Sequence, residues 1–125
     1  MAELFNPSVP IYLQLCERIK NKIIRGEIGM GERLPSVRDL AIDSGVNPNT
    51  VQRTYRELEE TGIVEKKRGQ GTFVTEDPAI LHQMREELKA SHITLFVSEM
   101  REMGYSETEM LDGLKLYLDK KEENQ

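Results

Sequence analysis

A turn of three residues between two helical segments constrains the fold of this chain more than any other feature of its sequence. Ser36 suits the N-cap of the first segment, because its side chain can accept a hydrogen bond from an otherwise unpaired backbone N–H. Gly45 permits the backbone to bend where that segment ends. Asn47 suits the next N-cap, and Pro48 fits the first helical position, where its missing N–H costs nothing. The sequence therefore predicts two short helices joined by a tight turn.

The segments on either side of this helix pair extend the pattern. Apolar residues at helical spacing predict an earlier helix over residues 10–25. Residues 63–67 predict a strand, residues 68–71 a tight turn and residues 72–74 the returning strand. Helix, helix, turn, helix and hairpin is the order of a winged helix-turn-helix. We therefore expect an α+β, mostly helical fold, with a winged helix-turn-helix domain over residues 1–75.

Two further helices are expected in residues 76–125, which we interpret as a dimerisation tail. The first runs from about residue 78 to residue 103, and the second begins with the capping box Ser106–Glu109. Their apolar surface is too large for a lone appendage, so the sequence favours pairing of two copies over packing of both helices on the winged domain. The apolar residues expected to form this interface are Leu81, Met84, Leu88, Leu95, Phe96, Met100, Met103, Met110, Leu111, Leu114, Tyr117 and Leu118.

The net charge of −5 looks unfavourable for binding to nucleic acid, but the charge is unevenly distributed. Up to Thr75 there are 11 Lys/Arg and 10 Asp/Glu residues, which gives +1. From Glu76 onward there are 6 Lys/Arg and 12 Asp/Glu residues, which gives −6. Binding of phosphates needs a local basic surface rather than a basic protein. The acidity therefore belongs to the tail and does not exclude DNA binding by the winged domain.

Polar side chains gather at the start of the third predicted helix, where helices of this kind enter the major groove. Amide side chains there can pair with adenine and arginine with guanine, and cations beside a glycine-rich hairpin turn can contact phosphates or the minor groove. Taken singly, Asn47 could be only a cap, Thr50 only a partner of the backbone and Arg53 only solvated. The residues expected to contact DNA are Arg33, Ser36, Arg38, Asn47, Asn49, Thr50, Gln52, Arg53, Lys67, Arg68, Gly69 and Gln70.

Other kinds of chemistry find little support in the sequence. His82 and His92 lie ten positions apart, which is not a metal-ligand spacing, and Cys16 lies on an apolar stripe. No glycine-rich nucleotide loop is present, so we expect no catalytic residues, no metal and no cofactor. No run reaches the roughly 18–20 apolar residues of a membrane span, and the start of the chain does not read as a secretion signal. We therefore expect a cytoplasmic protein that is not an enzyme and does not bind membranes.

Several runs of residues together resemble the GntR family of bacterial regulators, over roughly residues 8–75. The runs are Pro10–Tyr12, Arg33–Ala41, Val46–Val51, Tyr55–Glu59 and Arg68–Val74. The Asn-Pro-Asn-Thr turn and the short tail resemble the YtrA subfamily. This resemblance implies a homodimer that binds a palindromic operator in double-stranded DNA, usually as a repressor and often at operons for ABC-type transporters.

By position, the resemblance implies that Arg38 contacts DNA from the second helix and that Arg68–Gln70 form the tip of the wing. Many relatives carry Arg where Pro48 and Gln52 stand, so guanine readout by these two positions is not available here. The tail is too short for the effector domains of larger relatives. Any small-molecule effector would therefore have to bind at the dimer interface or between tail and winged domain. The alternative function is a protein-interaction module that keeps the winged fold.

Overall fold

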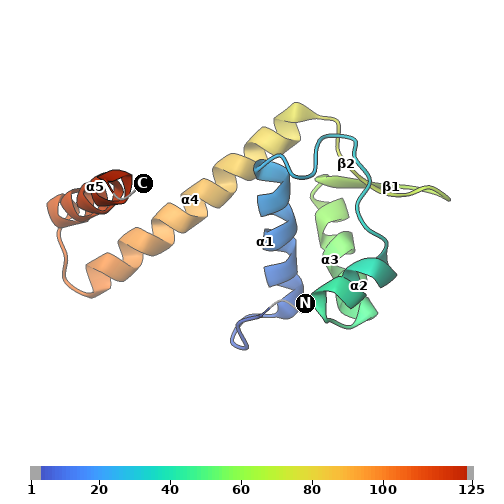
Figure 1. The fold of residues 1–125 in the computed structure, drawn as a ribbon, viewed down its shortest axis with the longest axis horizontal. Helices are drawn as coiled ribbons and strands as arrows, with labels where there is room; N and C mark the ends of the chain where they lie inside the picture. Colours follow the sequence, from blue (N-terminus) through green and yellow to red (C-terminus); the bar gives the residue numbers. More distant parts are fainter. Residues whose placement is uncertain (1–3, 124–125) are drawn as a thin grey trace. The chain divides into compact units, whose positions relative to one another are not determined.

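The computed structural model describes residues 4–123 and contains two compact units, one ending at Arg85 and the other beginning at Glu86. The ends of the two predicted domains, residues 1–3 and 124–125, lie outside the described residues. The order of the elements confirms the predicted helices and hairpin. In chain order the elements are α1 (Ile11–Ile24), α2 (Val37–Ser44), α3 (Pro48–Glu60), β1 (Val64–Lys67), β2 (Gly71–Val74), α4 (Pro78–Glu102) and α5 (Glu107–Glu123) (Figure 1).

The core of the first unit forms where α1 packs along α3 (Figure 1). α1 buries Leu15 and Ile19 on the face that helical spacing predicts. α3 contributes Val51 and Leu58, whose exposed fraction is 0%. Because these residues recur every three or four positions, each helix turns one apolar stripe to the other and leaves its remaining surface to polar side chains.

The ends of α2 and α3 are formed by the residues that the sequence predicts. The Ser36 hydroxyl accepts a hydrogen bond from the Asp39 backbone N–H at 3.1 Å, and Gly45 ends α2 in the left-handed region at φ 68°. The Asn47 side chain accepts a hydrogen bond from the Asn49 backbone N–H at 2.8 Å. These caps satisfy N–H groups that a helix start leaves unpaired, and they fix the turn between the two helices.

β1 and β2 form an antiparallel hairpin in which Val64 pairs with Val74. The connector between α1 and α2, which the sequence predicts only as a turn-rich segment, runs along the other edge of β2. There the Leu34 backbone N–H donates to the Thr72 carbonyl oxygen at 2.8 Å, and the Val74 N–H donates to the Glu32 carbonyl oxygen at 2.9 Å. An isolated hairpin is only marginally stable in water. These additional bonds therefore attach the hairpin to the connector between α1 and α2.

The first turns of α4 belong to the first unit, which extends past the domain end predicted from the sequence. Met84 is only 4% exposed, and Leu81 is half-buried. Ile80 packs at the end of α3, where its Cδ1 lies 3.4 Å from the point at which a Cβ on Gly62 would stand. Burial of these apolar side chains accounts for the extension of the unit to Arg85.

The second unit comprises the rest of α4 together with α5, and the predicted capping box begins α5. The Ser106 hydroxyl accepts a hydrogen bond from the Glu109 backbone N–H at 3.2 Å. In return, the Glu109 carboxylate accepts one from the Ser106 backbone N–H at 3.0 Å. An ion pair of 3.2 Å between Arg101 and Glu107 joins α4 to α5 across their turn. Met110 is 5% exposed and forms the buried centre of this small unit.

Candidate nucleic-acid interface

The first half of α3 turns polar side chains to the solvent. Asn49, Gln52 and Arg53 are exposed, whereas Val51 and Tyr55 are buried in the core. This division follows from helical spacing, because the positions that alternate with the apolar stripe point away from it. Amide and guanidinium groups at these positions carry the donors and acceptors that can pair with base edges in a major groove.

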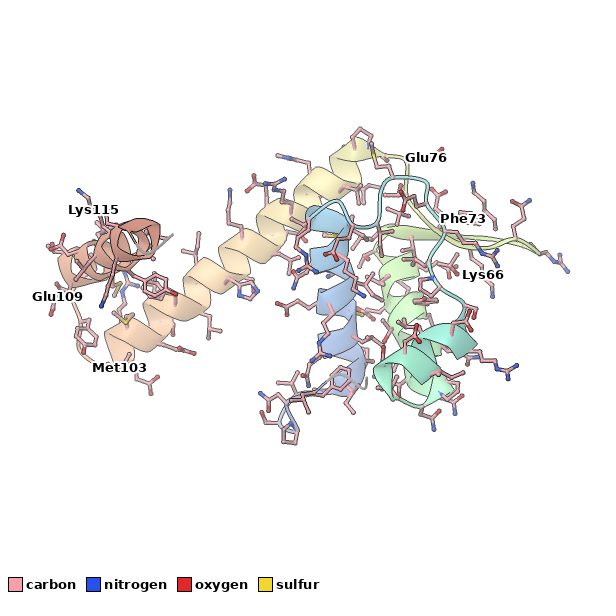
Figure 2. All side chains as sticks on the ribbon, in the orientation of Figure 1. Lys66, Phe73, Glu76, Met103, Glu109 and Lys115 are labelled. Atoms are coloured by element: carbon pink, nitrogen blue, oxygen red, sulfur yellow. The ribbon has the colours of Figure 1, made fainter. Side chains whose placement is uncertain are left out.

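A groove of about 460 Å³ lies between α2, α3 and the hairpin. Gln52 and Arg56 line it from α3, and Lys66 lines it from β1, where Figure 2 shows it on the hairpin. Tyr55 also lines the groove, and its hydroxyl donates a 2.6 Å hydrogen bond to the Pro35 carbonyl oxygen. Burial raises the pKa of Tyr55 well above its usual range. The phenol therefore stays neutral and tethers the segment before α2 to α3.

Arg53 lies in a different hollow, of about 410 Å³, which the starts of α1 and α3 form. Its guanidinium carbon lies 3.9 Å from the centre of the Tyr12 ring, which is a cation–π contact. Asn49 and Thr50 line the same hollow, and Thr50 is half-buried. The residues of α3 that the sequence predicts to contact DNA therefore divide between two hollows with different neighbours.

The start of α2 places Arg38 in the solvent on the first turn of that helix. Ser36 and Asn47, which are also predicted to contact DNA, use their side-chain oxygens for the N-cap bonds of α2 and α3. The Ser36 O–H and the Asn47 amide N–H groups are donors, and donors suit phosphate oxygens. Both side chains therefore have a structural role that is independent of any contact with DNA.

The tip of the hairpin exposes Arg68, Gly69 and Gln70, the predicted tip of the wing. The Gln70 backbone N–H closes the turn by donating to the Lys67 carbonyl oxygen at 2.9 Å. The Lys67 ammonium lies 4.7 Å from the centre of the Phe73 ring on β2, which Figure 2 labels. This contact packs the Lys67 stem against the hairpin and keeps its charge at the hairpin surface.

Arg33 reaches the hairpin from the connector that precedes α2. Its backbone forms an isolated β-bridge with Phe73. Its side chain crosses Gly71, because Nε of Arg33 lies 2.7 Å from the point at which a Cβ on Gly71 would stand. Gly71 also has a φ of 124°, a region that favours glycine. The sequence places Gly71 only in the turn, whereas the structure shows that Gly71 also leaves room for the Arg33 guanidinium.

Two cations of the groove between α3 and the hairpin are absent from the residues predicted to contact DNA. Arg56 lies four positions after Gln52, and residues four apart share one face of a helix, so helical spacing could have identified it. Lys66 belongs to the run of cations beside the predicted hairpin turn, but nothing in the sequence places β1 beside that face of α3. We add Arg56 and Lys66 to the candidate interface.

Cys16 is part of the core of the first unit. It is 4% exposed, and its thiol donates to the Thr54 carbonyl oxygen at 3.6 Å. Burial raises the pKa of the Cys16 thiol to about 11, against a smaller lowering by Lys20. The thiol is therefore a protonated packing group rather than a nucleophile. Among the described residues, no group of three His, Cys, Asp or Glu side chains could hold a metal ion.

Most residues predicted to pair two copies are exposed in the second unit, where they leave apolar surface in the solvent. Leu111 is 70% exposed and Leu118 54%. Met110 is buried within the unit, and Leu88 and Met100 are half-buried. The other exposed members of the predicted set are Leu95, Phe96, Met103, Leu114 and Tyr117. Between α4 and α5 lies a groove of about 360 Å³ that Phe96, Leu111 and Leu114 help to line.

The first unit has the parts that define a winged helix-turn-helix, a class of DNA-binding proteins. They are a helical core, an exposed polar helix start and a cationic hairpin beside it. No helix within residues 4–123 is long and apolar enough to cross a membrane.

The chain belongs to the gntR family of bacterial regulatory proteins, whose family model matches residues 11–74. It is 45% identical to the uncharacterised HTH-type transcriptional regulator YhcF of Bacillus subtilis, over 94% of this chain and 97% of YhcF. It is 46% identical to the transcriptional repressor YtrA of the same species, over 56% of this chain and 54% of YtrA. A solved GntR family transcriptional regulator from Listeria monocytogenes superposes with a TM-score of 0.84 and 38% identity, covering 89% of this chain and 97% of that one. The protein is therefore a transcription regulator with a DNA-binding winged helix.

Proposed function

We propose that this protein is a homodimeric repressor that binds a palindromic operator, with α3 in the major groove and the hairpin as a wing. The observation that carries the proposal is the exposed polar start of α3, where Asn49 and Gln52 face the solvent and Gln52 lines a groove together with Arg56 and Lys66. Amide groups with cations nearby suit base edges and the phosphates that flank them.

The individual roles follow from the chemistry of each side chain. Asn49 and Gln52 are amides that can pair with adenine in the major groove. Arg38 and Arg68 are exposed cations on separate elements, so they suit phosphates on either side of the bases that α3 reads. Arg56 and Lys66 line the groove with Gln52 and give it two cations against the single carboxylate of Glu59. Binding should therefore combine base preference from α3 with a strong dependence on salt.

Pairing of two copies is proposed to occur through the second unit. Leu111, Leu114 and Leu118 recur at helical spacing on α5, and each is about half exposed or more, at 70%, 46% and 54%. Contiguous apolar surface of this kind usually marks an interface. A two-fold interface would place two copies of α3 on half-sites one helical turn of DNA apart, roughly 34–36 Å. The palindromic operator follows from that symmetry.

Repression is proposed because the relative YtrA, which is 46% identical over 56% of this chain, bears the name of a transcriptional repressor. Within the proposal, the homodimer silences a gene by occupying the operator. The operator sequence should be determined first. Pro48 and Gln52 predict base preferences different from those of relatives that carry arginine at these two positions.

The test is selection of bound duplexes from a random pool, followed by gel shifts on the enriched sequence. We expect a palindrome to be enriched and the complex to contain two chains. Asn49→Ala should weaken binding and relax preference at one base position, by about 1–3 kcal/mol. Glu60→Ala, in the last turn of α3 and exposed, is the matched control and should leave binding unchanged. Failure to enrich any palindrome would contradict the proposal and favour a protein-interaction module.

A further inference from the structure

We propose that Tyr12 is a positioning residue that holds Arg53 against a phosphate of the DNA backbone, so that Arg53 is not a base reader. This inference rests on the proposed function and gives a role to a side chain of α1. From the sequence, Arg53 is expected to contact DNA from the start of the third helix, and Tyr12 is only part of the run Pro10–Tyr12 in the first helix.

The contact between the two side chains is close and well supported. The guanidinium carbon of Arg53 lies 3.9 Å from the centre of the Tyr12 ring. The backbone of Tyr12 lies against α3, because the Thr54 hydroxyl is within hydrogen-bond distance of the Tyr12 carbonyl oxygen at 3.3 Å as well as of the Thr50 carbonyl oxygen at 2.9 Å. Thr54 is fully buried, with an exposed fraction of 0%. The ring that supports Arg53 is therefore attached to the same core as α3.

The direction of the Arg53 side chain separates it from Gln52 and Arg56 of the same helix. Gln52 and Arg56 line the groove that faces Lys66 of the hairpin, whereas Arg53 lines the hollow that Tyr12 and Asn49 share. An arginine that reads guanine must extend from the recognition helix toward the base edge. Arg53 instead lies back across the start of α1, at the margin of the surface where the DNA backbone would pass.

The chemistry of a stacked guanidinium suits a phosphate. The guanidinium carbon of Arg53 lies over the Tyr12 ring, and a planar guanidinium that rests on a ring keeps the N–H donors at its edge for other partners. Within residues 4–123 the Tyr12 ring is the partner that the structure gives Arg53, and no carboxylate neutralises its charge. A planar, charged group with free N–H donors binds phosphate oxygens bidentately. Stacking reduces the number of rotamers that Arg53 must give up when it binds.

The experiment is a double-mutant cycle on the full chain, read out as operator affinity over a range of salt concentrations. Arg53→Ala should weaken binding about tenfold for all sequences alike. It should also lower the slope of log K against log salt by about 0.9 for each Arg53 that contacts DNA. Tyr12→Leu should weaken binding about two- to fivefold. Tyr12→Phe, which keeps the ring, should stay within about twofold of the wild type.

Coupling between the two positions distinguishes positioning from a merely structural role. If Tyr12 acts through Arg53, adding Tyr12→Leu to Arg53→Ala should cost no further affinity. Additive losses in the double variant would overturn the role of Tyr12. Relaxed preference at one base position in Arg53→Ala would overturn the phosphate role of Arg53. If Tyr12→Leu does not fold, Arg53→Ala still decides the phosphate role, because Arg53 is exposed and alanine favours helix.

These failures differ from failure of the proposed function. If wild-type protein bound no operator with salt-dependent affinity, the repressor proposal itself would fall. If wild-type protein bound a palindrome but Arg53→Ala kept the full salt slope, only the inference about Arg53 and Tyr12 would be wrong.

Discussion

The Nε atom of Arg33 lies 2.7 Å from the position that a Cβ on Gly71 would occupy. The two residues are far apart in sequence and meet because the connector before α2 runs beside β2, where Arg33 forms a bridge with Phe73. Gly71 is therefore required both for its backbone conformation, with φ at 124°, and for the space it leaves. The conformation of the hairpin at Gly71 therefore determines where the Arg33 guanidinium can lie.

Gly71→Ala should destabilise the protein by about 1–3 kcal/mol, because alanine is strained at this φ, and should also displace the Arg33 guanidinium. Thermal unfolding measures the loss of stability, and operator affinity measures the effect of displacing Arg33. Gly26→Ala is the matched control, since its φ is 81° but nothing lies within 4 Å of its added Cβ, and it is not among the residues expected to contact DNA. The account would be wrong if Gly26→Ala weakened DNA binding as much as Gly71→Ala did.

Ser106→Ala should destabilise the start of α5 by about 1 kcal/mol, because it removes the hydroxyl that accepts from the Glu109 N–H. We expect a lower melting temperature and weaker association of two copies, measured by calorimetry and analytical ultracentrifugation. Ser98→Ala, at an exposed position of α4, provides the control and should change neither quantity. If the Ser106→Ala variant associated as strongly as the wild type, α5 would not be part of the dimer interface.

Leu118→Glu should raise the dissociation constant of the dimer at least about tenfold, because a carboxylate would have to be desolvated in an apolar interface. Leu118 is 54% exposed in the single chain, so the substitution should leave the fold of the chain intact. Lys120→Ala changes the net charge by the same amount at another exposed position of α5 and serves as the control. Sedimentation that stays dimeric for Leu118→Glu would exclude this face from the interface.

Alkaline pH should reduce stability through Cys16, whose pKa rises from 9.0 to about 11 on folding because of burial. A pKa that is raised in the folded state contributes stability that is complete below pH 9 and is lost as pH rises toward 11. The loss should approach about 1.4 kcal/mol per pH unit within that window. Denaturant unfolding from pH 8 to pH 11 measures it, with Cys16→Ala as the comparison. Parallel pH profiles for wild type and variant would show that the thiol does not titrate as proposed.

The prediction from sequence succeeded where the determining contacts are local. Ser36 and Asn47 form caps with groups two or three positions away, and Ser106 and Glu109 bond to each other across one helical turn. Such bonds depend only on the backbone conformation of a few consecutive residues. Apolar spacing in α1 and α3 likewise identifies the buried faces before any packing is known. The exposed start of α3, with Asn49, follows from these two signals together.

The sequence by itself thus determined the order of the elements, their caps and their buried faces, because these properties repeat over a few residues along the chain. Only the tertiary structure decided which distant residues meet. Arg53 lies on Tyr12 because α1 packs against α3, and Arg33 crosses Gly71 because the connector joins the edge of β2. Met84 is buried in the first unit although the sequence assigned it to the tail interface. Contacts of this kind depend on how whole elements pack to bury apolar surface, and that arrangement is a property of the complete fold.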